Sequence, residues 1–277
     1  MKKLRFCLLG DGQIARYHRK AIEHVGGEIG CVIDPKYDPA FNRNTWRDIA
    51  SISQYELIAC NYFVICSPSF LHYSQIQWIL SNTDTSSRII CEKPAFLPWE
   101  NIIDDDRINI VLQLRYLPDL PGKADLVIAH FLRDQEYFLT WKGNAKKTGG
   151  IFYNIWIHYL DLAILMDADF EGSLNLPDND IPSLIQFDKK TKPIRRSIHF
   201  REWNNEPPGG QLLNIIDLQK IDMQACYNRL YEDVISGGGI KPKDILYLNW
   251  ALQRNSEIFG YGLNGMNRLI KIGKELL

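Results

Sequence analysis

Residues 4–15 read LRFCLLGDGQIA, an apolar run that ends in a glycine-containing turn and leads into a second apolar pattern. The apolar run predicts a buried strand, and Ile14–Val25 predicts a helix. Gly10 permits a tight turn after the strand, and Gly12 lets the backbone approach a pyrophosphate without a Cβ in the way. This stretch therefore predicts the first strand, turn and helix of a dinucleotide-binding fold.

The residues around the turn support the same interpretation. Gln13 and Ile14 open the helix, whose N-terminus would face the negative charge of the pyrophosphate. Ala15 keeps the helix and the strand close together. Asp34 ends the next predicted strand, 24 residues after Gly10, near the roughly 20 expected for a ribose-binding carboxylate. We expect NAD to be the cofactor.

The chain up to about Tyr116 alternates between short apolar runs and a helical pattern. Such alternation is typical of an α/β fold, here an N-terminal Rossmann domain with a doubly wound parallel sheet. The further strands expected are Ile29–Ile33, Tyr62–Cys66, Arg88–Cys91 and Ile108–Leu114, with a helix over Leu71–Leu80.

The pattern changes after Tyr116, where Pro118 and Pro121-Gly122 interrupt the chain. We therefore expect an NAD-binding domain over 1–117 and a substrate-binding and oligomerisation domain over 118–277. The second domain reads as α+β with a mostly antiparallel sheet, because several strands follow one another without intervening helices. The strands expected are Asp125–Arg133, Ser183–Phe187, Ile194–Arg201 and Gln211–Leu218, and the helices are Gly150–Met166, Met223–Ile235 and Ile245–Phe259.

Composition excludes several classes of function. The chain has 277 residues, 45% of them hydrophobic, and a formal net charge of −1, which argues against a nucleic-acid binder. Its six cysteines form no C-x-x-C pair, so we expect reduced thiols, a cytoplasmic protein and no metal site. No segment has the length of a membrane span, and membrane partners are not expected.

Lys93 is the first candidate catalytic residue. It follows the predicted strand Arg88–Cys91 in the tripeptide Glu92-Lys93-Pro94. A lysine at the carboxyl end of a strand in a doubly wound sheet points into the crevice where ligands bind. There it can hydrogen-bond a substrate hydroxyl and stabilise the oxygen from which a hydride leaves. A solvent-exposed surface lysine is the alternative.

Asn154 and His158 are four residues apart, so a helix would place both on one face, with Asp161 a turn further on. A histidine there can exchange a proton with a hydroxyl near neutral pH. The alternative is a core histidine bonded to a backbone carbonyl. The combination with Lys93 favours the catalytic interpretation.

Taken together, the glycine turn, Glu92-Lys93-Pro94 and the Asn154–His158 motif resemble the glucose–fructose oxidoreductase / inositol dehydrogenase (Gfo/Idh/MocA) family over nearly the whole chain. The resemblance implies that Glu92 and Lys93 lie beside the nicotinamide and that the second motif completes the site. The segment 67–72 is similar to the family's S/T-P-N-x-x-H, with Ser69 in place of asparagine. It implies cofactor contacts from Ser67, Pro68 and His72.

More narrowly, the chain is similar to the UDP-N-acetylglucosamine / UDP-N-acetylglucosaminuronate 3-dehydrogenases of bacterial surface-polysaccharide (lipopolysaccharide) biosynthesis. This similarity implies a cofactor contact from Gln113 and substrate contacts from Arg115, Lys142, Asn144, Asn154 and His158. Two departures stand out. Trp156 replaces a glycine of that subgroup, and Phe170–Leu218 is shorter than in the relatives.

These observations predict an NAD(H)-dependent oxidoreductase that oxidises the C3 hydroxyl of a UDP-N-acetylhexosamine or its uronate. Lys93 would bind the reacting oxygen, His158 would act as acid and base, and Asn154 would orient the hydroxyl. A homodimer or homotetramer is implied. The alternatives are an oxidoreductase of a free sugar, cyclitol or amino sugar, and a non-catalytic dinucleotide-binding sensor.

Overall fold

The computed structural model divides into two compact units. The first comprises residues 1–116 and 223–244, and the second comprises 117–222 and 245–277. The structure describes residues 3–37, 44–118, 120, 126–131, 139–150, 153–154, 157–158, 161–162, 168–171, 195–202, 214–217, 221–246 and 248–249.

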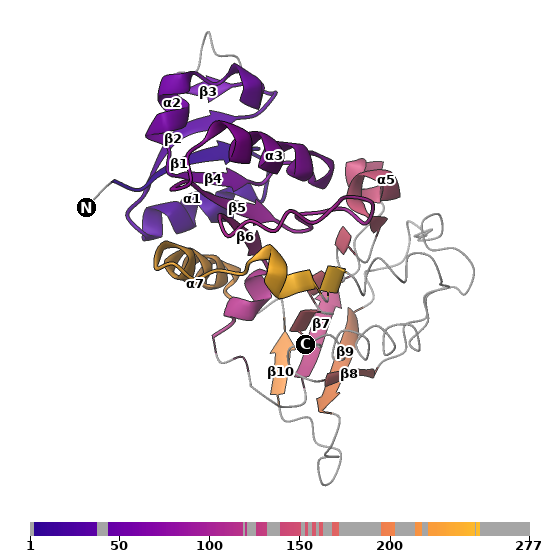
Figure 1. Ribbon diagram of the computed structural model, residues 1–277. Helices are drawn as coiled ribbons and strands as arrows, with labels where there is room; N and C mark the ends of the chain where they lie inside the picture. Colours follow the sequence, from indigo (N-terminus) through magenta and orange to yellow (C-terminus); the bar gives the residue numbers. More distant parts are fainter. Residues whose placement is uncertain are drawn as a thin grey trace. The chain divides into compact units, whose positions relative to one another are not determined.

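The first unit is built on a six-stranded sheet in the order β3-β2-β1-β4-β5-β6, with every neighbouring pair parallel (Figure 1). This is the strand order of a dinucleotide-binding Rossmann fold. The strands are β1 (Arg5–Leu9), β2 (Glu28–Ile33), β3 (Thr45–Trp46), β4 (Tyr62–Ile65), β5 (Arg88–Glu92) and β6 (Ile108–Val111). The fold class predicted for this part of the chain is confirmed.

Four helices of the first unit are described: α1 (Ala15–His24), α2 (Gln54–Ala59), α3 (His72–Asn82) and α7 (Met223–Ile235). Figure 1 shows α1 and α7 side by side, on the opposite side of the sheet from α3. The strands between them are almost wholly buried, which explains why they read in the sequence as continuous apolar runs.

Helix α7 corrects the predicted domain organisation. The sequence placed 118–277 in one domain, but residues 223–244 group with the first unit. The buried side chains Tyr227, Leu230, Tyr231 and Val234 of α7 join the core formed by β1, α1 and β4. A helix whose apolar face is completed by α1 and the sheet is stabilised mainly by that burial.

Strand β6 is also shorter than predicted. The sequence suggested a strand over Ile108–Leu114, but β6 ends at Val111 and a 3-10 helix, η3, spans Gln113–Tyr116. Strand β3 and helix α2 were not predicted. Ser53 caps α2 by accepting a hydrogen bond from the Glu56 backbone N–H at 3.2 Å, which is half of a capping box.

The second unit contains a four-stranded sheet in the order β10-β7-β9-β8. Strand β9 pairs antiparallel with β7 and β8, whereas β10 pairs parallel with β7, so the sheet is mostly antiparallel as predicted. Its strands are β7 (Leu126–Phe131), β8 (Ala168–Glu171), β9 (Arg195–Glu202) and β10 (Asn214–Asp217). Strand β8 was not predicted.

The remaining described elements of the chain are short. They are the 3-10 helices η1 (Ile49–Ser51), η2 (Ser69–Leu71), η4 (Trp141–Gly143) and η6 (Pro242–Ile245), and the helix α5 (Ala145–Thr148). The predicted strand Ser183–Phe187, most of the predicted helix Ile245–Phe259 and Trp156 lie outside the described residues. None of the described helices is both long and apolar enough to cross a membrane.

Candidate active site

The glycine turn brings the carboxyl ends of β1 and β4 into close contact. Gly10 has φ 94°, a conformation that side chains disfavour, and its N–H donates to the Ile33 carbonyl at 2.8 Å. A Cβ on Gly10 would lie 2.7 Å from the Ser67 nitrogen, which no real structure tolerates. A Cβ on Gly12 would meet nothing within 4 Å, so the backbone there is open to a ligand.

Asp34 is held by the two turns at the carboxyl ends of β1 and β2. Its Oδ2 accepts the Asp11 N–H at 2.7 Å, and its Oδ1 accepts the Lys36 N–H at 3.0 Å. A carboxylate offers about four acceptor positions, and these two bonds use one on each oxygen. This geometry fits a carboxylate that also accepts hydrogen bonds from two ribose hydroxyls.

The other residues predicted to bind along the cofactor lie at the same edge of the sheet. Gln13 is exposed and Ile14 half-buried at the beginning of α1, where backbone N–H groups attract an anion. Ser67 follows β4, and its hydroxyl donates to Gln75 Oε1 at 2.6 Å. Pro68 precedes η2. Parallel strands end together here, which is where such sheets bind ligands.

His72, predicted to contact the cofactor, begins α3 directly after η2. Its ring is buried, with Nδ1 2.8 Å from the Pro94 carbonyl and Nε2 2.8 Å from the Ser67 carbonyl. Burial lowers the pKa of His72, and the two carbonyls oppose that shift only partly. The imidazole joins the segment after β4 to the segment that carries Lys93, and the cofactor contact expected of His72 stays a prediction.

Glu92, predicted to contact the cofactor, ends β5. It is only 6% exposed, and its Oε1 accepts a hydrogen bond from the Tyr227 hydroxyl at 2.6 Å and lies 3.2 Å from His18 Nε2. Its Oε2 accepts the Lys93 N–H at 3.3 Å. Oε1 is thus directed to α1 and α7, and the cofactor contact expected of Glu92 stays a prediction.

The buried group around Glu92 extends further. His18 is fully buried, and its Nδ1 lies 2.8 Å from the Tyr231 hydroxyl. Burial raises the pKa of Glu92, but His18, Lys93 and Tyr227 outweigh burial and hold it at about 2. The carboxylate is therefore ionised at neutral pH. Glu92 therefore connects β5, the strand that precedes Lys93, to α1 through His18 and to α7 through Tyr227.

Gln113 begins η3, just beyond the end of β6. Its Oε1 is buried and accepts no hydrogen bond from the described residues, so it is an acceptor suited to a donor such as a carboxamide NH₂. Arg115 is half-buried on the same short helix. Tyr116 ends it, and its hydroxyl donates to Asp233 Oδ2 of α7 at 2.7 Å.

Of the predicted substrate-binding residues, Lys93 and Arg115 belong to the first unit, and the second unit carries Lys142, Asn144, Asn154 and His158. Lys142 lies in η4, where the Thr140 hydroxyl accepts its backbone N–H. Asn144 follows, and its Oδ1 accepts the Lys146 N–H at 3.0 Å, so this side-chain oxygen caps α5. The capping bond gives the Asn144 oxygen a structural role that the sequence did not suggest.

Asn154 and His158 are both buried in helical conformation. Asp161, another turn along, is buried as well. Asn154, His158 and Asp161 are spaced by four and three residues, so a helix places these buried side chains on one face. Lys93 belongs to the first unit, whereas Asn154 and His158 belong to the second.

The residues of the first unit fit a bound dinucleotide. The backbone at Gly12 is open and would contact the pyrophosphate. The Asp34 carboxylate, positioned by two backbone N–H groups, would contact the ribose. The Gln113 oxygen would accept a hydrogen bond from an amide. Within the part of the chain that the structure describes, no group of three or more His, Cys, Asp or Glu side chains could hold a metal ion.

Comparison with known proteins agrees with this geometry. The first unit has the sheet of a dinucleotide-binding Rossmann fold, and the second unit has a mostly antiparallel sheet. The family model GFO_IDH_MocA_C, described as the oxidoreductase family's C-terminal alpha/beta domain, matches residues 124–173. This match supports the resemblance to the Gfo/Idh/MocA family over residues 124–173, and the solved structures below share the fold.

Three solved structures share the fold. The WlbA (WbpB) dehydrogenase from Thermus thermophilus, in complex with NAD and UDP-GlcNAcA, is 20% identical, with a TM-score of 0.56 over 99% of this chain and 94% of its own. A myo-inositol dehydrogenase from Corynebacterium glutamicum is 14% identical, with a TM-score of 0.53 over 98% and 94%. An oxidoreductase from Agrobacterium radiobacter, in complex with NAD+, L-tartaric acid and magnesium, is 12% identical, with a TM-score of 0.57 over 95% and 99%.

Proposed function

We propose that the chain is an NAD(H)-dependent oxidoreductase that acts on a CH–OH group of a sugar. One observation carries the proposal. The turn at Gly10 and Gly12, the positioned Asp34 and the lysine after β5 lie at the carboxyl edge of one Rossmann sheet. That edge is where such folds bind dinucleotides and place the reacting groups.

The chemistry assigns a role to each candidate residue. NAD, when bound, accepts a hydride from the carbon that bears the hydroxyl. Lys93 would donate a hydrogen bond to the reacting oxygen and stabilise its developing negative charge. His158 would take the hydroxyl proton, and Asn154 would orient the hydroxyl. These roles rest on the residue types and on the family resemblance.

The substrate we propose is a UDP-N-acetylhexosamine or its uronate, oxidised at C3 in the synthesis of a surface polysaccharide. The supports are the motif similarity around Arg115, Lys142 and Asn144, and the UDP-GlcNAcA bound in the similar Thermus thermophilus structure. We further propose that the protein is a cytoplasmic homo-oligomer, with the second unit providing the substrate and oligomer contacts.

An oxidoreductase of a cyclitol or free sugar is the second candidate. The similar fold of the myo-inositol dehydrogenase from Corynebacterium glutamicum favours it. Trp156 also bears on the choice, since a large ring stands where the nucleotide-sugar subgroup has glycine. The same cofactor and the same catalytic residues would serve either substrate.

The experiment that tests the function is a substrate panel. Purified protein is incubated with NAD and, separately, UDP-GlcNAc, UDP-GlcNAcA, myo-inositol and free glucose, and NADH formation is followed at 340 nm. We expect turnover with a UDP-sugar. Turnover with inositol or glucose alone would select the second candidate, whereas NADH binding without turnover on any substrate would favour the non-catalytic sensor.

We predict that NADH binds more tightly than NADPH. The Asp34 carboxylate can accept hydrogen bonds from both ribose hydroxyls, but it repels a 2′-phosphate. The nearby ammonium of Lys36 is already bonded to the carbonyl and carboxylate of Asp11. Fluorescence titration with both cofactors measures the preference. Equal affinities, or a tighter complex with NADPH, would contradict it.

A further inference from the structure

Asp11 lies between the two glycines of the turn and is in contact with the residue that is proposed to bind ribose. Its N–H donates to Asp34 Oδ2 at 2.7 Å, so the two acidic residues are neighbours at the ends of β1 and β2. The Asp11 side chain is 14% exposed. The dinucleotide pattern places no requirement on the residue at this position, and the sequence alone assigned it no role.

The Asp11 carboxylate gathers three groups. Arg19 of α1 donates to Oδ1 through Nε at 3.0 Å, and its Nη2 lies 2.9 Å from the same oxygen. Tyr37 donates its hydroxyl to Oδ2, and the Lys36 ammonium lies 3.3 Å from Oδ2. Lys36 also stands over the Tyr37 ring, 5.0 Å from its centroid. The Asp11 carboxylate therefore forms ion pairs with two cations, Arg19 and Lys36.

The charge state of the group follows from these contacts. Burial raises the pKa of Asp11, but Tyr37, Arg19 and Lys36 together lower it, so the carboxylate is ionised at neutral pH. Burial lowers the pKa of Lys36, and Asp11 more than reverses that shift. Arg47 contacts the same turn through the Tyr37 carbonyl at 3.0 Å. Among the described residues, Arg19 and Lys36 are thus engaged with Asp11.

We propose that Asp11 is a specificity-determining residue that excludes a 2′-phosphate by neutralising Lys36 and Arg19 beside Asp34. This inference deepens the proposed function and rests on it, because it assumes that Asp34 binds the adenosine ribose. A 2′-phosphate carries between about one and a half and two negative charges at pH 7. Among the described residues, it would meet the carboxylates of Asp11 and Asp34, and Lys36 and Arg19 are already paired with Asp11.

The first test is Asp11→Asn, which keeps the size of the side chain and removes its charge. We expect the Kd for NADPH to fall about tenfold, because two cations a few ångströms away lose their compensating charge. The Kd for NADH should change less than about threefold, since NADH has no charge at the 2′ position. The gain for NADPH should shrink in high salt, as a charge effect near the surface does.

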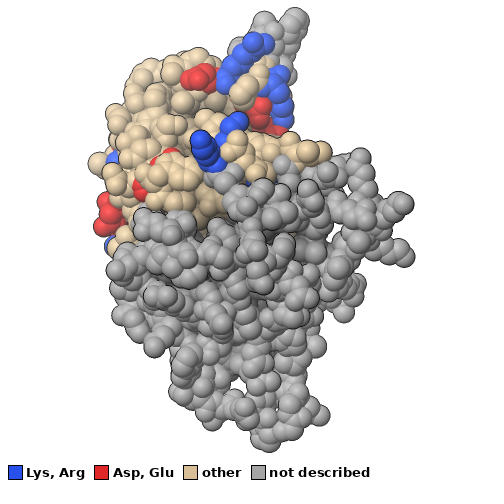
Figure 2. Space-filling model, turned by 90° about the vertical axis from the view of Figure 1, so that its right-hand side faces the viewer, with Lys and Arg blue, Asp and Glu red and all other residues tan. Residues whose placement is uncertain are grey.

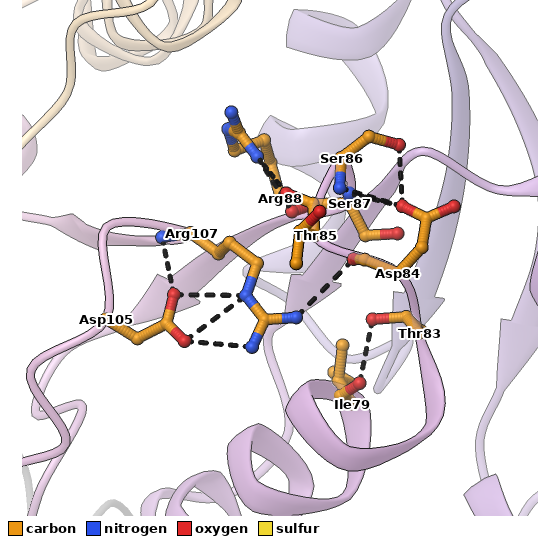
Figure 3. Close-up of polar contacts among 9 residues, drawn as sticks. All are labelled: Ile79, Thr83, Asp84, Thr85, Ser86, Ser87, Arg88, Asp105 and Arg107. Carbon is orange, nitrogen blue, oxygen red and sulfur yellow. Dashed lines mark hydrogen bonds and ion pairs between the residues drawn. The ribbon is translucent and has the colours of Figure 1, made fainter.

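The matched control is Asp105→Asn at the opposite, amino-terminal edge of the same sheet. Figure 3 shows Asp105 bound by the Arg107 guanidinium, with Nη2 at 2.8 Å and Nε at 3.0 Å from its two oxygens. This variant removes the same charge from a similar Asp–Arg pair. It should leave the ratio of the two affinities unchanged.

The second test uses Lys36, which is exposed and whose replacement leaves the fold intact. In the wild-type background, Lys36→Ala should change the Kd for NADPH less than about twofold, because Asp11 already neutralises the cation. In the Asp11→Asn background, the same change should remove most of the gain. A tenfold loss of NADPH affinity from Lys36→Ala alone overturns the proposal.

Two further outcomes separate this proposal from the proposed function. If Asp11→Asn is folded by circular dichroism and binds NADH, but its affinity ratio stays within twofold of the wild type, Asp11 does not determine specificity. The proposed function then stands. If the wild-type protein binds neither cofactor in the titration, the proposed function fails, and this inference fails with it.

Discussion

Replacing Lys93 or His158 with alanine is expected to lower turnover on the true substrate by a factor on the order of a hundred or more, because each variant lacks a positioned hydrogen-bonding or acid–base group. Neither residue is assigned to the adenosine half of the cofactor. NADH affinity should therefore change little, and the loss should appear in kcat. Steady-state rates and an NADH fluorescence titration on the same samples measure the two quantities.

Two surface residues of α1 provide matched controls for these variants. Lys20 is exposed, and His24 is 42% exposed beside Glu232. Lys20→Ala and His24→Ala remove the same side-chain types without touching the proposed reaction. Both should keep near wild-type rates. If Lys93→Ala or His158→Ala kept more than half of the wild-type kcat, the role assigned to that residue would be wrong.

The cofactor edge of the sheet was predictable because its signals are local. Gly10 needs a left-handed backbone and a close approach to Ser67, and both needs follow from the strand-turn-helix pattern around it. Asp34 stands where β2 ends, so its place follows once that strand is recognised. The contacts of Asp11 with Asp34 and Lys36 were not predicted, because they depend on how two separate turns fold together.

The domain organisation was only partly predictable, for a non-local reason. The bounds of α7, Met223–Ile235, were predicted from its apolar spacing. That spacing indicates a helix with one buried face, but it does not indicate whether this face packs in the core of the first unit or of the second. Tyr227 meets Glu92 across 135 positions of sequence, and no local pattern encodes that contact. The helix was therefore correct and its assignment to the second domain was wrong.

The N-terminus of α2 has a capping pattern in the sequence from which this helix could have been predicted. Ser53 and Glu56 form the S-x-x-E pattern of a helix N-terminus, and the structure has Ser53 accepting the Glu56 N–H. The short helix behind it has Tyr55 and Ile58 exposed, so it lacks the apolar face by which helices are usually recognised. Without that face, the cap alone did not suffice.

The charged group around Glu92 leads to the second large prediction, which concerns stability. Glu92→Ala leaves the His18 imidazole and the Tyr227 hydroxyl buried without their shared acceptor. Leaving a buried polar group without its hydrogen-bond partner costs about 1–3 kcal/mol, so we expect the loss of both contacts to cost about 2–6 kcal/mol. Tyr227→Phe, which removes one hydrogen bond, should cost about 1 kcal/mol. Urea denaturation followed by circular dichroism measures both changes.

The matched control for Glu92 lies on the same pair of helices. His24 of α1 and Glu232 of α7 form a similar pair at 2.7 Å, but both side chains are largely exposed, at 42% and 56%. Glu232→Ala should therefore cost no more than about 1 kcal/mol. If Glu92→Ala cost as little as this surface change, the buried group would not be holding α1, β5 and α7 together.

The contribution of Glu92 to stability should also depend on pH. The folded-state pKa of Glu92, about 2, lies below its ordinary value of 4.5, so between these values the unfolded chain binds more protons than the folded one. The stability that Glu92 contributes is therefore present above about pH 4.5 and is lost as the pH falls toward 2. The difference in unfolding free energy between wild type and Glu92→Ala should shrink over this window. A difference that stayed constant from pH 6 to pH 3 would mean that the ionised carboxylate is not the source of the stability.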